Sequence, residues 1–131
     1  TLRCLPIIEL HLDHLPQGAN PVYSYEAKWV WPEDDNIYAC PAPVDPNLQA
    51  QIEQTCIAAW NALGLCDWAR MDVRLDAQGV PSIIEVNPIP GCLPDPNHHS
   101  AFPMAARKAG LSYTELICSV LDTALARKAL L

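Results

Sequence analysis

The chain has 131 residues, enough for one domain with a buried core, and its 50% hydrophobic and 18% charged residues argue against intrinsic disorder. Its formal net charge of −7 argues against nucleic acid or an anionic membrane as a partner, since both need a basic surface. No apolar run approaches transmembrane length and the N-terminus lacks the features of a signal peptide, so we expect a soluble cytoplasmic protein.

Six cysteines are spread singly along the chain, without a C-x-x-C pair. This spacing indicates neither a zinc ribbon nor a dithiol redox motif. Several of them lie inside apolar helical or strand patterns, where a free thiol behaves as a small hydrophobic group. We expect reduced thiols, and the even count leaves a disulfide framework as the alternative.

The chain begins with a short apolar run, residues 5–10, that predicts a strand interrupted near its start by Pro6. His11 and His14 follow with a three-residue spacing that could suit a metal ion on a helix. The turn-forming residues around them favour surface histidines instead. A second extended segment is predicted for residues 22–31.

A proline-rich and acidic stretch, residues 32–46, predicts a loop with only a brief apolar run at 37–40. Asp45 can then cap a helix whose first residue is Pro46, and Gly64 ends that helix. Its apolar positions are spaced by three and four residues, which is typical of a helix that packs one face on a core. They are Leu48, Ile52, Cys56, Ala59, Trp60 and Leu63.

Two apolar and β-branched runs around a turn predict a β-hairpin. The runs are residues 70–75 and 80–87, and the turn between them places Gly79 where φ can be positive. The second run continues into Pro-Ile-Pro-Gly at residues 88–91, which suggests a fixed loop beside the hairpin.

Polar side chains are expected to gather on one face of this hairpin. Side chains alternate along a strand, so Arg70 and Asp72 share a face, and a turn of even length would bring Glu85 and Asn87 to it, whereas a β-bulge would change the parity. Two carboxylates and an amide oxygen suit Mg²⁺ or Mn²⁺, which completes its shell with water and nucleotide phosphates. A solvated charged face is the alternative, but a carboxylate inside the apolar second run needs a partner.

Two helices are predicted after the hairpin. Ser100 is placed to cap a short helix over residues 101–109 that Gly110 closes. The sequence Ser-Tyr-Thr-Glu at residues 112–115 is a capping box that starts a last helix. Its inward positions are predicted to be Leu116, Ile117, Val120, Leu121 and Ala124.

Several sequence blocks together resemble the D-alanine–D-alanine ligase family, whose members have the ATP-grasp fold. These blocks are residues 25–29 (YEAKW), 69–74 (ARMDVR), 84–91 (IEVNPIPG) and 99–113 (HSAFPMAARKAGLSY). They keep the family's order and cover most of the chain. The resemblance implies an α+β fold, the C-terminal ATP-grasp subdomain, with a mainly antiparallel sheet packed with helices and one lobe over residues 1–131.

The resemblance also implies a reaction and the residues that serve it. Family members are ATP-dependent ligases of peptidoglycan biosynthesis that join two amino acids, here expected to be D-alanine and D-alanine, through an acyl phosphate. The expected cofactors are ATP and two Mg²⁺ (or Mn²⁺) ions. The implied residues are Asp72, Glu85 and Asn87 for metal, with Glu85 bridging the ions, Arg70 and the Gly91 amide for catalysis, Lys28 and Ile84 for ATP, and Ser100 for the acceptor substrate.

The resemblance is to the C-terminal lobe alone. We therefore expect a longer natural protein, an isolated chain that does not ligate, ATP and amino acids as partners, and a homodimer formed through regions absent from this sequence. The loop between Gly91 and Ser100 is longer than in familiar members, which leaves the acceptor open. The alternatives are an ATP-grasp ligase with another amino acid or a peptide as acceptor, and a non-catalytic module that binds metal or nucleotide.

Overall fold

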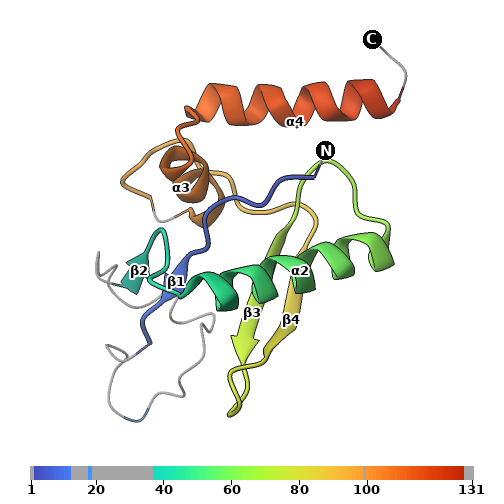
Figure 1. Cartoon of the computed structure of the whole chain (residues 1–131). Coiled ribbons are helices and arrows are strands. Elements are labelled where there is room, and N and C mark those ends of the chain that lie inside the picture. Colours follow the sequence, from blue (N-terminus) through green and yellow to red (C-terminus); the bar gives the residue numbers. More distant parts are fainter. Residues whose placement is uncertain (1, 13–17, 19–36, 99, 129–131) are drawn as a thin grey trace.

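The computed structural model of the chain describes residues 2–12, 18, 37–98 and 100–128 (Figure 1). In chain order its elements are β1 (Glu9–Leu10), β2 (Tyr38–Ala39), α2 (Pro46–Leu63), β3 (Arg70–Leu75), β4 (Pro81–Asn87), α3 (Ala101–Lys108) and α4 (Tyr113–Arg127). Within these residues β1 pairs with β2 and β3 pairs with β4, both antiparallel. This α+β arrangement confirms the predicted fold class.

Helix α2 has the predicted ends. The Asp45 side chain accepts hydrogen bonds from the amides of Asn47 and Leu48 at 2.9 and 3.1 Å, and Pro46 occupies the first turn, where its missing N–H costs nothing. At the other end Gly64 has φ 61°, the left-handed conformation that glycine adopts most readily. Local sequence alone therefore sets both ends of this helix.

The capping box of α4 is complete, because the Glu115 amide donates to Ser112 Oγ at 3.2 Å and the Ser112 amide donates to Glu115 Oε2 at 2.7 Å. Ser100 has the extended backbone of an N-cap residue at the start of α3, but its side chain makes no capping hydrogen bond. The prediction that Ser100 caps α3 with its hydroxyl is therefore wrong, because that hydroxyl is engaged by the loop that precedes it.

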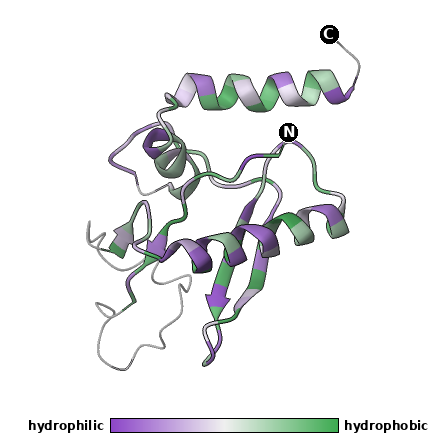
Figure 2. Ribbon diagram, in the orientation of Figure 1, coloured by the Kyte–Doolittle hydropathy of each residue, from purple (hydrophilic) through white to green (hydrophobic). Residues whose placement is uncertain are grey.

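The elements stack around the β3–β4 hairpin. Helix α2 packs on β4 and crosses the hairpin, while α3 and α4 contact each other at the far end (Figure 1). Figure 2 shows hydrophobic and hydrophilic residues alternating along α2 and α4, as in helices with one covered face. The buried residues of the described part are few, and three of them lie on α3: Ile52, Pro81, Pro90, Ser100, Pro103, Ala105, Ala106 and Leu116.

Several predictions about elements need correction. The first strand is shorter than predicted, and the run at 37–40, predicted as part of a loop, supplies its partner, with Glu9 opposite Ala39. On α4, Ile117 and Leu121 were predicted to point inward but are 36% and 55% exposed. The segment 22–31 and His14 lie outside the described residues. Among the described helices, none combines the length and the hydropathy of a membrane span.

Candidate metal and nucleotide site

The predicted site lies on the β3–β4 hairpin, where two irregularities compensate each other. The turn has an odd length, residues 76–80, because Leu75 pairs with Pro81. An odd turn alone would put Asp72 and Glu85 on opposite faces. A β-bulge restores the parity, since Val73 pairs with Ile83 whereas Asp72 pairs with Glu85.

The turn itself is fixed by Asp76. Its carboxylate accepts hydrogen bonds from the amides of Gln78 and Val80 at 2.9 and 2.8 Å, and Gly79 has φ 79°, as predicted for the turn glycine. Beyond the bulge, Arg70 pairs with Asn87 and Asp72 pairs with Glu85. Directly paired residues share a face of the sheet, so the four polar residues lie together as predicted.

Arg70 and Asp72 form a two-point ion pair within this group. Arg70 Nε donates to Asp72 Oδ1 at 2.8 Å and Arg70 Nη2 donates to Asp72 Oδ2 at 3.1 Å. Both side chains are 27% exposed. The planar guanidinium matches the carboxylate geometry, so both oxygens of Asp72 are engaged by one cation.

Asn87 links this ion pair to the second carboxylate. In the amide orientation that satisfies its neighbours, its oxygen accepts from Arg70 Nη2 at 3.0 Å and its nitrogen donates to Glu85 Oε1 at 3.2 Å. The four side chains thus form a continuous network of Asp72, Arg70, Asn87 and Glu85. The network brings two carboxylates and an amide oxygen to one open face.

This donor set fits a hard divalent cation that the protein holds only in part. No cluster of three or more His, Cys, Asp or Glu side chains occurs among residues 2–12, 18, 37–98 and 100–128. Two carboxylates and an amide are fewer ligands than a closed protein cage provides. Mg²⁺ or Mn²⁺ bound by so few protein oxygens would complete its shell with water and phosphate oxygens.

Ile84 is the extra residue of the bulge, between Ile83 and Glu85. It is 65% exposed. Simple alternation predicts that it points away from Glu85 and fills the core. The bulge interrupts that alternation, and the large exposure excludes core filling within this lobe. The apolar side chain is therefore available to a partner beside the polar network.

Gly91, the predicted oxyanion donor, lies in a loop that two helices hold in place. Ser100 Oγ donates to the Gly91 carbonyl at 2.9 Å and accepts from the Leu93 amide at 3.2 Å, while Tyr113 Oη donates to the Cys92 carbonyl at 3.0 Å. A Cβ added to Gly91 would meet no atom within 4 Å, and its φ is not in the left-handed region. Neither packing within the lobe nor backbone strain explains this glycine.

Two contacts before β3 fix the approach to the site. Arg127 at the end of α4 donates from Nε and Nη2 to the Asp67 carboxylate at 3.1 and 2.7 Å. These hydrogen bonds hold the pKa of the Asp67 carboxyl below its usual value. Trp68 packs edge-to-face on Phe102 of α3, with ring centroids 5.3 Å apart. The polar sequence at Asp67 carried no signal of this long-range pair.

The remaining predicted residues divide as follows. Lys28 lies outside the described residues. Ser100 is 7% exposed, and its hydroxyl is used by the loop on both its donor and acceptor sides. Its predicted role in acceptor binding would require exchange of one of these bonds.

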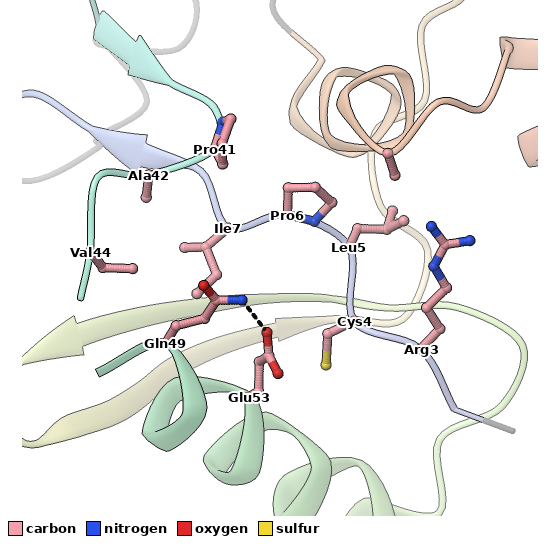
Figure 3. A pocket seen from close by; sticks show the side chains of 11 residues that line it. Arg3, Cys4, Leu5, Pro6, Ile7, Pro41, Ala42, Val44, Gln49 and Glu53 are labelled. Atoms are coloured by element: carbon pink, nitrogen blue, oxygen red, sulfur yellow. Dashed lines mark hydrogen bonds between the residues drawn. The ribbon is translucent and has the colours of Figure 1, made fainter. Parts of the chain in front are cut away.

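A separate hollow of about 320 Å³ lies between the N-terminal segment and α2 (Figure 3). Its lining includes Cys4, Ile7 and Glu53, whose carboxylate accepts a hydrogen bond from Gln49 Nε2 at 2.9 Å. None of the predicted site residues lines it. The hollow therefore makes a weaker candidate than the hairpin face.

The six cysteines are all free. Burial raises the pKa of the thiols of Cys4, Cys40, Cys56 and Cys92. A raised pKa leaves less thiolate at neutral pH and makes a thiol a weaker nucleophile. These side chains serve packing better than chemistry.

A family model described as D-ala D-ala ligase C-terminus matches residues 3–122 of the chain. The D-alanine–D-alanine ligase of Cupriavidus taiwanensis is 36% identical over 124 residues, which cover 95% of this chain and 34% of that protein. D-alanine–D-alanine ligase B of Chromobacterium violaceum is 36% identical over 107 residues, 82% of this chain and 33% of that protein. The chain thus spans about a third of the length of these relatives.

Solved structures of D-alanine–D-alanine ligases also match this chain. A crystal structure of the D-alanine–D-alanine ligase from Bacillus anthracis matches with a TM-score of 0.68 and 26% identity, over 95% of this chain and 37% of that one. The structure of the Bacillus anthracis enzyme complexed with ATP matches with a TM-score of 0.62 and 26% identity, over 69% of this chain and 30% of that one.

Proposed function

The chain belongs to the D-alanine–D-alanine ligase family, of which it carries the C-terminal ATP-grasp region, and from this membership we propose that it is the metal-binding lobe of an ATP-dependent ligase. The reaction joins two amino acids, D-alanine to D-alanine, for peptidoglycan synthesis in the cytoplasm. ATP phosphorylates the carboxylate of the first amino acid, and the amine of the second displaces phosphate from the acyl phosphate. The lobe works as part of a longer, dimeric protein that supplies the other wall of the ATP site.

The observation that carries this proposal is the pairing of Asp72 with Glu85 and of Arg70 with Asn87 on one open face. Such chemistry depends on alignment and on neutralising phosphate charge, which needs oxygen ligands and a cation rather than a side-chain nucleophile. Asp72, Glu85 and Asn87 would hold two Mg²⁺ or Mn²⁺ ions, with Glu85 between them. These ions would neutralise the phosphate oxygens of bound ATP.

The other residues are given the roles that the family resemblance implies. Arg70 is paired with Asp72, a proposed metal ligand. Its guanidinium would move from that carboxylate to the phosphoryl group. The exposed Ile84 would pack on the adenine. The Gly91 amide would donate to the oxyanion of the tetrahedral intermediate, with close approach allowed by the missing side chain. Lys28 would contact the phosphates and Ser100 the carboxylate of the acceptor.

The test is calorimetric titration of the chain with ATP in the presence and absence of Mg²⁺, comparing wild type, Glu85→Gln and Glu53→Gln. Losing an outer-shell partner of a metal ligand typically costs on the order of 10-fold to 100-fold in metal affinity, and loss of a ligand should cost at least as much. We expect Mg²⁺-dependent binding that Glu85→Gln abolishes. Glu53→Gln removes the same charge from α2 and should leave binding intact.

Mg²⁺-dependent ATP binding that survives Glu85→Gln would refute the metal role of the hairpin face. If the wild-type lobe binds no nucleotide, the same pair of variants is assayed for ligation in the longer protein. An active Glu85→Gln enzyme would then refute the proposal.

A further inference from the structure

The loop that carries Gly91 is held by Ser100, proposed above to contact the acceptor, and by Tyr113, which has no role in the proposed chemistry. Gly91 follows Pro90, which is buried and whose ring fixes φ. After Gly91, two successive peptide groups are tied to the helices: the Gly91 carbonyl to Ser100, and the Cys92 carbonyl to Tyr113. The backbone is therefore constrained on both sides of the Gly91 amide.

The amide of Gly91 itself donates no hydrogen bond to any described residue. The carbonyl of the same residue accepts a hydrogen bond from Ser100 Oγ at 2.9 Å. Gly91 is exposed, its carbonyl is hydrogen-bonded and its amide is not. The amide N–H is therefore a donor whose direction the loop restricts. A donor of this kind stabilises a developing negative charge without reorganisation during the reaction.

We propose that Tyr113, together with Ser100, is a positioning residue that aims the Gly91 amide at the reacting carbonyl oxygen. This inference rests on the proposed ligase function. Tyr113 is the first residue of α4 and reaches back 21 residues in sequence to the Cys92 carbonyl. The Ser112 capping box fixes the start of α4 and therefore the position of Tyr113. The Tyr113 hydroxyl in turn holds the loop at Cys92.

Tyr113→Phe is the sharpest variant because it removes one hydroxyl and keeps the ring. It leaves the Cys92 carbonyl without its partner, and loss of one such bond weakens positioning by roughly two- to tenfold. We expect kcat of the longer ligase to fall by about that factor while KM for ATP stays unchanged. Ser119→Ala is the matched control, because the Ser119 hydroxyl donates only within α4, to the Leu116 carbonyl at 2.7 Å.

A second readout uses the 131-residue chain. In its ¹H–¹⁵N spectrum, Tyr113→Phe should shift the amide resonances of Gly91 and Cys92 and speed their hydrogen exchange, while Ser119→Ala leaves both unchanged. A merely structural role for Tyr113 would lower the unfolding temperature without a selective change in kcat.

The outcomes separate the two proposals. Unchanged Gly91 and Cys92 resonances in Tyr113→Phe overturn the positioning role, whatever the enzyme does. Shifted resonances with an unchanged kcat overturn the link between Gly91 direction and catalysis but leave the ligase proposal standing. A longer wild-type protein that performs no ligation overturns the proposed function, and this inference with it.

Discussion

Arg70 donates to both oxygens of Asp72, so a metal ion that binds Asp72 competes with the guanidinium for this carboxylate. The perturbation that exposes this competition is Arg70→Lys, which keeps the positive charge but loses the two-pronged geometry. With the nucleotide absent, we expect the variant to bind Mn²⁺ more tightly than wild type. With nucleotide present, it should bind the nucleotide less tightly, because a fork suited to phosphate is lost.

The size of the effect follows from the geometry of the pair. Two well-formed charged hydrogen bonds would be strong if buried, but both partners are 27% exposed, so solvent weakens them. About 1 kcal/mol is a reasonable contribution for such a pair. That free energy corresponds to about a fivefold change in affinity, so lysine, which retains part of the contact, should tighten Mn²⁺ binding by roughly two- to fivefold.

Calorimetric titration of the nucleotide-free chain with Mn²⁺ measures this directly. Arg74→Lys makes the same chemical change two residues further along β3 and controls for a general effect of the substitution. Weaker Mn²⁺ binding by Arg70→Lys, or an equal gain in Arg74→Lys, would refute competition between Arg70 and the metal for Asp72. If neither the wild type nor any variant binds Mn²⁺, the proposal of a metal site on this face would be refuted.

Two further predictions concern stability. The hydrogen bonds from Arg127 lower the pKa of Asp67, so their stabilisation is present above the ordinary aspartate pKa of about 3.9 and is lost as pH falls through the lower folded value. Asp67→Asn should therefore flatten the fall in unfolding temperature between about pH 5 and about pH 3, and an unchanged slope would contradict this. Ile52 is 9% exposed, so Ile52→Ala should cost about 2 kcal/mol or more in chemical denaturation, whereas Ile57→Ala, at 37% exposure, should cost clearly less; equal losses would place the core elsewhere.

Local sequence signals predicted the elements well wherever one residue type had a single structural role. Asp45, Pro46 and Gly64 specified the ends of α2, and Ser112 with Glu115 specified the start of α4. Each of these signals acts within one turn of helix, so no knowledge of the rest of the fold was needed. The ends of these helices could therefore be predicted from local residues, whereas the fold class was predicted from the family resemblance.

Contacts between distant segments were beyond this kind of reading. Asp67 pairs with Arg127 across 60 residues, and Ser100 uses its hydroxyl on Gly91 rather than on the helix it precedes. The β2 strand was also missed, because a run of two paired residues has no periodicity to detect. Where a side chain has several possible partners, tertiary packing determines which one it contacts. Sequence spacing carries no information about that packing.

The shared face of the hairpin is the instructive case, because a correct result came from an incomplete premise. Assuming an even turn placed Glu85 with Asp72, yet the turn is odd and the bulge at Ile84 supplies the missing shift. A one-residue change in register would move Glu85 and Asn87 to the opposite face, so turn and bulge must be retained together. The same bulge leaves Ile84 exposed beside Glu85.

The polar network also offsets the repulsion between two neighbouring carboxylates on an open face. Asp72 is neutralised by Arg70, and Glu85 accepts from Asn87, whose oxygen in turn faces Arg70. Charge repulsion between the carboxylates is thereby offset inside the folded chain. The residues proposed to bind metal are then already held near their working positions, and the arginine that satisfies them is the group proposed to move onto phosphate. Stability of the free lobe and readiness to bind are properties of the same four side chains.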